Sequence, residues 1–275
     1  MVLINGESRA FIEIADRGFQ YGDGLFETIE VRNGQAVFLK QHLQRLGLGC
    51  QRLRIPVPDA QTLTFEVNGL CRQMQGTQAV LKIIVTRGSG GRGYRQPDTV
   101  QPTRVLSLHP YPDYPKNYAE QGIVARFCSS RLGLNPGLAG IKHLNRLEQV
   151  MARAEWDDPG IQEGLMLDIN GQVIEGTMSN LFYAKNHRLY TAALTHSGVA
   201  GVMRGLVMQF AAEQGSPVIE HSFTREELLS ADEIFVCNSI IGLWPVRQIE
   251  NTHFPVGAIS QRLQSRLHQF SHDDK

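Results

Sequence analysis

The chain has 275 residues, of which 42% are hydrophobic and 20% are charged. These proportions exclude an intrinsically disordered chain and are typical of a globular protein, long enough for one large or two medium domains. Lysine plus arginine and aspartate plus glutamate are equal, at 27 residues each, so the net charge does not indicate binding to nucleic acid or to a membrane surface.

The first third of the chain mixes strands with helices. Asn33-Gly34 forms a turn between two apolar segments, which predicts a β-hairpin. From Leu39 onward, apolar residues recur at helical spacing until Pro56 ends the helix. We predict strands at residues 25–31, 36–39, 79–87 and 104–108, and helices at residues 39–53 and 61–74.

Residues 110–117 contain three prolines, which prevent a regular element and predict an interdomain linker. We therefore predict a smaller N-terminal domain at residues 1–109 and a larger C-terminal domain at residues 118–275. In the second domain we expect strands at 122–131, 164–168, 172–175, 181–184, 188–191 and 233–237, helices starting near 201 and 224, and a last helix at 259–270. Strands and helices do not alternate strictly, which favours an α+β protein over a doubly wound sheet.

The N-terminal sequence, the apolar runs and the cysteines all bear on the compartment in which the protein is found. The N-terminal sequence MVLINGESRAF lacks the basic start and apolar core of a secretory signal, and no apolar run approaches the roughly 18 to 20 residues that span a bilayer. The four cysteines are far apart and form no CxxC pair, so we expect buried, reduced thiols without zinc or another metal. We expect a cytoplasmic protein. The cysteines are Cys50, Cys71, Cys128 and Cys237.

A glycine-rich segment, GSGGRGY at residues 88–94, follows the predicted strand 79–87. A dinucleotide-binding loop would continue into a helix, but Pro97 and Pro102 prevent one, and no GK[ST] ending indicates a nucleotide P-loop. A loop that presents Arg87, Arg92 and Tyr94 to a carboxylate-bearing ligand is one alternative, because a guanidinium fork suits carboxylates. A plain surface loop is the other.

Lys142, in the segment LAGIKHLNRLEQV, is a candidate catalytic amine. An amine attacks an aldehyde only when part of it is uncharged, which burial and nearby cations promote. Apolar neighbours such as Ile141 would desolvate Lys142, and His143 and Arg146 would add positive potential. The alternative is a solvated lysine near the start of a helix.

Other segments supply what one cofactor, pyridoxal 5′-phosphate, requires: an amine, an acid for the ring nitrogen and an anion site for the phosphate. Glu175, in GQVIEGTMSNLF, precedes a glycine near a strand end, and Gly201-Val202-Met203 opens a helix whose N–H groups can bind an anion. Arg45 lies on the helix 39–53, and Ser239 ends a buried strand. Each has an ordinary alternative. Glu175 could be an edge-strand glutamate, the helix that opens at Gly201 could be a core helix, and Arg45 could face solvent.

Together these segments resemble the fold-type IV family of pyridoxal phosphate enzymes, which includes branched-chain and D-amino-acid aminotransferases. The similarity extends from LINGE through DRGFQYGDGLFETIEV and FLKQHLQRL to GVMRG and FVCNSIIGLWPV. TRGSGGRGY and LAGIKHLNRLEQV are similar to aminodeoxychorismate lyases in particular. The resemblance implies an α+β protein with a smaller N-terminal α/β domain and a larger, β-barrel-like C-terminal domain that carries the lysine.

The resemblance also implies a role for individual residues. Lys142 would be the Schiff-base lysine and Glu175 the partner of the pyridine nitrogen, while Thr28 would face the cofactor as a catalytic residue. The residues expected to complete the cofactor site are Arg45, the backbone amides of Val202 and Met203, Ser239 and Asn180. From the composition of their loop, Arg92 and Tyr94 are candidates for binding the substrate carboxylates. Glu27 receives no role, because successive strand side chains face opposite ways and Glu27 should point away from Thr28.

The activity that the resemblance implies is a lyase reaction of folate biosynthesis, from 4-amino-4-deoxychorismate to 4-aminobenzoate and pyruvate, in a homodimeric enzyme. Two alternatives stay open. One is an aminotransferase of the same fold that acts on D- or branched-chain amino acids. The other is a non-catalytic protein that binds pyridoxal phosphate.

Overall fold

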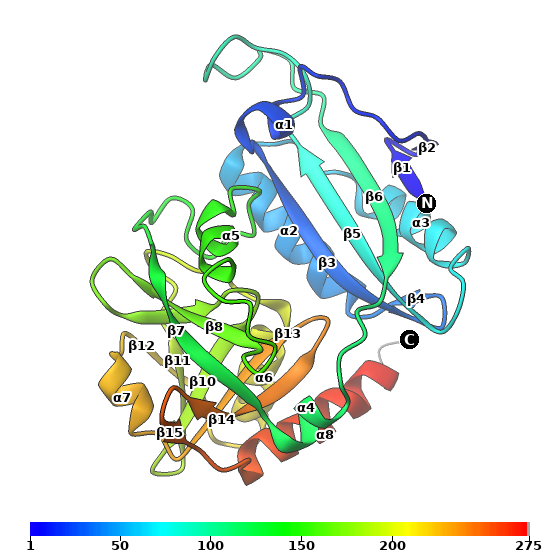
Figure 1. The fold of residues 1–275 in the computed structure, drawn as a ribbon. Coiled ribbons are helices and arrows are strands. Elements are labelled where there is room, and N and C mark those ends of the chain that lie inside the picture. The colour runs from blue at the N-terminus through cyan, green and yellow to red at the C-terminus, as the bar shows by residue number, and fades with distance from the viewer. Residues whose placement is uncertain (274–275) are drawn as a thin grey trace. The chain divides into compact units, whose positions relative to one another are not determined.

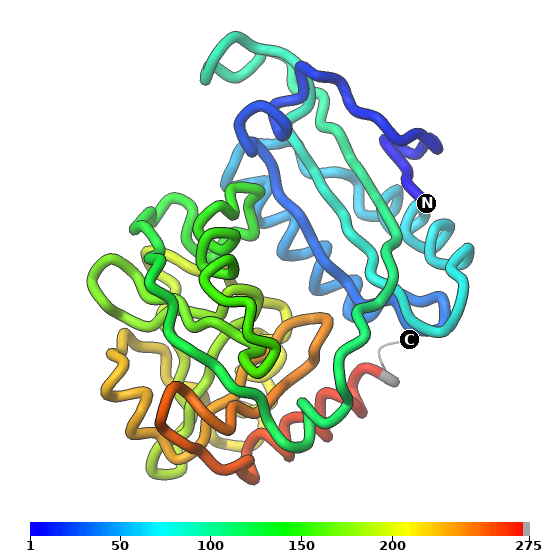
Figure 2. The backbone as a smooth tube through the Cα atoms, in the orientation of Figure 1, coloured from blue at the N-terminus to red at the C-terminus, as the bar shows by residue number. Residues whose placement is uncertain are grey.

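The computed structural model describes residues 1–273, which divide into two compact units. The first unit comprises Met1–Pro112 and Ile141–Asn145, and the second comprises Asp113–Gly140 and Arg146–Asp273. Figure 2 shows the backbone of both units, coloured from blue at the N-terminus to red at the C-terminus. Lys142 thus groups with the first unit, whereas the sequence predicted it in the second domain. The reason is that its neighbour His143 forms a β-bridge with Leu25 of the first unit.

The first unit is built on an antiparallel six-stranded sheet in the order β2-β1-β6-β5-β3-β4. Two long helices, α2 and α3, cover one face of this sheet (Figure 1). The strands are β1 (Val2–Ile4), β2 (Glu7–Ser8), β3 (Gly24–Arg32), β4 (Gln35–Ala36), β5 (Gln78–Thr86) and β6 (Thr103–Pro110). The helices are α1 (Arg17–Tyr21), α2 (Leu39–Leu53) and α3 (Ala60–Cys71).

Strand β3 separates two chemically different faces of the sheet. Leu25, Ile29 and Val31 are buried in the core that the sheet forms with α2 and α3. Because side chains alternate along a strand, Phe26 and Thr28 lie on the opposite face, where both are only partly buried. Glu27 lies on the helix-covered face, away from Thr28, as the alternation predicts.

The second unit contains a closed barrel. Its strands are β7 (Ile123–Leu132), β8 (Glu163–Asp168), β9 (Val173–Gly176), β10 (Asn180–Lys185), β11 (Arg188–Ala192), β12 (Ile219–His221), β13 (Glu233–Asn238), β14 (Gly242–Ile249) and β15 (Thr252–His253). Six of them pair in a ring, β9-β10-β13-β14-β7-β8, which returns to β9 through β8. The helices are α4 (Asn117–Gln121), α5 (Leu147–Arg153), α6 (Val202–Glu213), α7 (Arg225–Leu229) and α8 (Ala258–Asp273).

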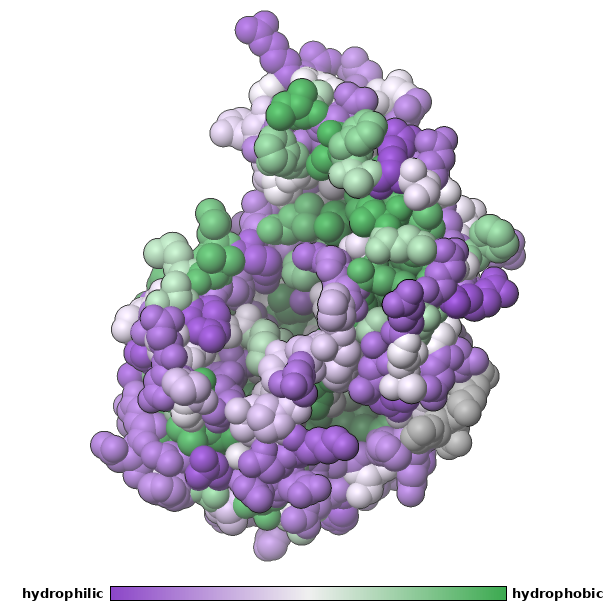
Figure 3. Space-filling view, turned by 45° about the vertical axis from the view of Figure 1, so that its right-hand side comes forward, coloured by the Kyte–Doolittle hydropathy of each residue, from purple (hydrophilic) through white to green (hydrophobic). Residues whose placement is uncertain are grey.

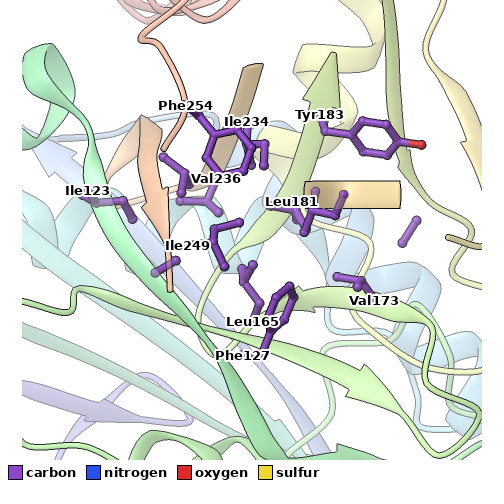
Figure 4. Packing of buried hydrophobic residues seen from close by; sticks show 14 of the residues in the cluster. Ile123, Phe127, Leu165, Val173, Leu181, Tyr183, Ile234, Val236, Ile249 and Phe254 are labelled. Carbon is purple, nitrogen blue, oxygen red and sulfur yellow. The ribbon is translucent and has the colours of Figure 1, made fainter. Parts of the chain in front are cut away.

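The interior of the barrel is filled by apolar side chains from several strands. Figure 4 shows Phe127, Leu165, Leu181, Val236 and Ile249 directed toward one another between the strands. Each fully buried side chain of this kind contributes roughly 1.5–3 kcal/mol to folding. Hydrophilic side chains cover most of the visible surface of the second unit (Figure 3).

The predicted α+β class and the barrel-like second half are confirmed. The predicted strand 36–39 is wrong in extent: β4 ends at Ala36, because Phe38 adopts a left-handed φ of 55° and α2 begins at Leu39. All four cysteines are buried, as expected. Among the described residues, no helix has the length and hydropathy to cross a membrane, and no cluster of histidine, cysteine and acidic residues could hold a metal ion.

Candidate active site

Lys142 lies on a short segment that extends the edge of the first unit's sheet. The Phe26 N–H donates to the Lys142 carbonyl at 3.1 Å, and the Leu144 N–H donates to the Gly24 carbonyl at 3.0 Å. Helix α5 begins only at Leu147. Lys142 is therefore a strand-like, partly buried residue whose side-chain direction is set by pairing with β3.

The amine of Lys142 is placed over an aromatic ring. Its Nζ lies 4.3 Å from the centroid of Phe26, and the Nζ of Lys82 lies 5.4 Å from the same centroid. Thr28 follows two residues further along β3, on the same face as Phe26, and is directly opposite Lys82 in the register of β3 and β5. Two ammonium groups beside one ring give this face a positive potential that suits an anionic ligand.

Arg45, predicted from α2, is held by a buried carboxylate. Its Nε donates to Glu27 Oε1 at 2.8 Å, and its Nη2 donates to Glu27 Oε2. His42 Nδ1 lies 2.6 Å from the same Oε2. Burial by itself would raise the pKa of Glu27, but the Arg45 charge and the hydrogen bonds from His42 and Arg45 hold it at about 2. Arg45 is thus a fixed guanidinium, not the solvent-facing arginine of the alternative interpretation.

The glycine-rich loop divides into an anchored base and an exposed tip. Arg87, at the base, donates to both oxygens of Asp23 and to the carbonyls of Leu53 and Arg54. The suggestion that Arg87 is presented to a ligand is therefore wrong, because its donors hold the fold together. Arg92 is exposed and Tyr94 is 88% exposed, so both remain candidates for contact with a substrate.

In the second unit, Glu175 and Asn180 face each other across β9 and β10. Glu175 Oε2 accepts a hydrogen bond from the Val199 N–H at 2.8 Å, and Asn180 Nδ2 donates to the Val199 carbonyl at 2.8 Å. Glu175 is buried, so it is not the ordinary edge-strand glutamate of the alternative. Both side chains bind the backbone of the segment that leads into α6.

The N-terminus of α6 has the features of an anion site. Gly201 is its N-cap residue and makes no side-chain cap hydrogen bond, and the first N–H groups of a helix have no partner within the helix, so those of Val202 and Met203 are candidate donors to an anion. A Cβ at Gly201 would lie 2.0 Å from Asn180 Oδ1, which explains the glycine. The predicted backbone donors therefore lie on a helix start that Asn180 packs against.

Ser239 is carried by a turn directly after β13. The Asn238 side chain fixes this turn: its Oδ1 accepts from the N–H groups of Ile240 and Ile241, at 2.8 and 2.9 Å, and its Nδ2 donates to the Met178 carbonyl. The serine is partly buried. Because the turn is held in place, the Ser239 hydroxyl has a fixed position from which it can hydrogen-bond to a ligand.

Sequence analysis missed Glu163, which fixes the turn between Glu175 and Asn180. Its carboxylate accepts from the N–H and hydroxyl of Thr177 and from the Ser179 hydroxyl, at 3.0, 2.6 and 2.6 Å. Complete burial raises the pKa of Glu163, against the lowering effect of these hydrogen bonds. The only signal in the sequence was an acidic residue at the start of an apolar strand, which does not reveal these partners.

Comparison with known proteins identifies relatives over nearly the whole chain. The family model for class IV aminotransferases matches residues 24–249. An aminodeoxychorismate lyase of Vibrio harveyi is 38% identical, over 97% of this chain and 99% of that protein. The crystal structure of 4-amino-4-deoxychorismate lyase from Pseudomonas aeruginosa is 45% identical with a TM-score of 0.93, over 98% of each chain.

An Escherichia coli branched-chain amino acid aminotransferase structure is more distant, at 26% identity and a TM-score of 0.84, over 97% of this chain and 92% of that one. These similarities confirm the fold-type IV architecture that the sequence predicted. The chain therefore belongs to the class IV aminotransferase family.

Proposed function

We propose that this protein is a pyridoxal-phosphate-dependent lyase that converts 4-amino-4-deoxychorismate to 4-aminobenzoate and pyruvate. The observation that carries the proposal is Lys142, whose amine the backbone pairing with β3 places over Phe26, on the face that also bears Thr28. The two relatives named as lyases are 38% and 45% identical, above the 26% of the aminotransferase structure compared, and this supports the lyase over the aminotransferase.

The chain's residues fit this cofactor. Lys142 supplies the amine, Glu175 supplies a buried carboxylate, and Arg45 and the uncapped start of α6 supply donors for an anion. In the proposed site, seven residues hold the cofactor. These are Lys142, Arg45, Glu175, Val202, Met203, Ser239 and Asn180.

When bound, pyridoxal phosphate supplies an aldehyde that carries the substrate amine and a protonated ring that withdraws electrons from the neighbouring carbon. Glu175 holds the proton at the ring nitrogen. Lys142 would act as the base that removes the proton from the substrate carbon bearing the amine, and the enolpyruvyl oxygen would leave from the adjacent carbon. Thr28 orients a proton toward that oxygen. Arg92 and Tyr94, at the exposed tip of their loop, bind the substrate carboxylates.

Borohydride reduction tests the cofactor and its attachment. The purified protein should absorb visible light through a Lys142-bound cofactor, and reduction should leave a pyridoxyl label on the peptide that contains Lys142. Lys142→Ala should lose the band. Peptide mass spectrometry after reduction makes the check, and a label on another lysine, or no band in the unmutated protein, would contradict the proposal.

An assay with 4-amino-4-deoxychorismate alone separates the proposed activity from its rivals. A lyase releases 4-aminobenzoate and pyruvate in equal amounts without any keto acid. Turnover that requires an added keto acid would establish the aminotransferase alternative instead. A bound cofactor without turnover in either assay would establish the non-catalytic one.

Thr28 is testable with two matched variants. Thr28→Val keeps the shape of the side chain and removes its hydroxyl, and we expect kcat to fall by about 10²-fold, within the range of lost acid–base assistance. Thr28→Ser restores a hydroxyl and should recover most of the rate. Steady-state kinetics make the measurement. Equal rates for the valine variant and the unmutated protein would remove Thr28 from the mechanism.

We also propose that the protein is a homodimer. The first unit exposes large apolar side chains, among them Phe11 and Ile14 at 75% each and Phe19 at 66%, which a partner chain could cover. Apolar residues are visible on the upper part of the surface in Figure 3. Light scattering after size-exclusion chromatography should give twice the mass of one chain, and a single-chain mass at micromolar concentration would refute the dimer.

A further inference from the structure

Glu27 received no role from the sequence, yet it is among the most enclosed charged groups of the first unit, with 1% of its surface exposed. Both of its oxygens are engaged by α2: Oε1 by Arg45 Nε, and Oε2 by Arg45 Nη2 and His42 Nδ1. A carboxylate that takes the Nε and Nη2 edge of a guanidinium fixes the plane of that group. Glu27 therefore determines which way Arg45 points.

This ion pair borders the candidate active site. Phe26, the chain neighbour of Glu27, donates its N–H to the Lys142 carbonyl at 3.1 Å. Leu25 and Ile141, which flank Glu27 and Lys142 in sequence, are buried in the same core. Glu27, which orients Arg45, and the lysine proposed to carry the cofactor thus adjoin the same core of the first unit.

We propose that Glu27, supported by His42, is a positioning residue that orients Arg45 for the phosphate of the cofactor. This inference rests on the proposed function, in which Arg45 binds that phosphate. A flexible arginine would have to be ordered when the phosphate binds, at a cost in conformational entropy. Because Glu27 already holds the Nε and Nη2 edge of the guanidinium, the orientation of Arg45 is set before the ligand arrives.

Glu27 could also act in the opposite sense, by neutralising Arg45 and weakening its attraction for phosphate. The two roles predict opposite effects of Glu27→Gln. If Glu27 only offsets charge, the variant should bind phosphate more tightly. If Glu27 positions Arg45, the variant should bind it less tightly, because the glutamine amide would present N–H groups to the donors of Arg45 and His42 and displace the guanidinium.

Titration of the apoprotein with two ligands isolates the phosphate contacts. Pyridoxal 5′-phosphate and pyridoxal both react with Lys142, but only the first has a phosphate, so the ratio of their dissociation constants reports the phosphate site. We expect Glu27→Gln to reduce this preference for the phosphorylated ligand by about 10-fold or more, with the binding of pyridoxal nearly unchanged. The absorbance of the lysine-bound ligand gives both constants.

A double-mutant cycle tests whether Glu27 acts through Arg45. Arg45→Ala should reduce the preference at least as much as Glu27→Gln, and the double variant should be no worse than Arg45→Ala alone. His42→Leu should lose part of the preference, and His42→Asn, whose amide can donate to Glu27, should restore part of it. Additive losses from Glu27→Gln and Arg45→Ala would overturn the proposal.

Glu66 provides a matched control in the same unit. It is also buried, at 7% exposure, and Arg104 donates to both of its oxygens, at 2.6 and 3.3 Å. Glu66→Gln makes the same chemical change in a similar ion pair and should leave the preference unchanged. An equal loss of preference in Glu66→Gln would show a general structural effect and overturn the proposal.

The outcomes for the two proposals are distinct. An unmutated apoprotein that forms no lysine-bound band with either ligand refutes the proposed cofactor and, with it, the positioning role. A normal band in the unmutated protein, together with an unchanged or increased phosphate preference in Glu27→Gln, refutes the role of Glu27 alone.

Discussion

The placement of Lys142 depends on one backbone interaction, the pairing of residues 142–144 with the edge of β3. An exposed strand edge presents unsatisfied N–H and C=O groups. Here the Phe26 N–H donates to the Lys142 carbonyl, and the Gly24 carbonyl accepts from the Leu144 N–H. The pairing fixes the register and so the direction of each side chain. The pairing leaves little room at Gly24, where a Cβ would lie 2.9 Å from Leu144 Cδ1.

In each unit, charges that are buried or partly buried are matched by donors or by an opposite charge. Glu27 is paired with Arg45 and Asp23 with Arg17 and Arg87, while in the second unit Glu175 and Glu163 accept hydrogen bonds from backbone or hydroxyl donors. Removing one partner of a buried ion pair costs about 3–5 kcal/mol, because the other charge stays behind. These pairs therefore keep Arg45 and the base of the glycine-rich loop in one arrangement.

The sequence predicted well whatever depends on local pattern. The bounds of helix 39–53 follow from apolar spacing and agree with α2, and the alternation of β3 correctly separated Glu27 from Thr28. The partners of Glu27 could not be predicted, because Arg45 is 18 residues away in sequence and its direction depends on how α2 packs on the sheet. The closure of the barrel, through the pairing of Asn180 with Glu175, likewise depends on contacts that periodicity does not encode.

The division of the glycine-rich loop into base and tip explains how one fold can serve different reactions. Lys142, Arg45 and Glu175 lie on or beside regular elements, where packing and buried ion pairs tolerate little change. The base of the loop is equally constrained, since Arg87 binds Asp23 and the carbonyls of Leu53 and Arg54. At the tip, Arg17 holds the backbone through the Gly93 carbonyl, but the side chains of Arg92 and Tyr94 are exposed. Under the proposed function, in which this tip binds the substrate carboxylates, substitutions there should alter the choice between lyase and aminotransferase more than substitutions in the core of the fold.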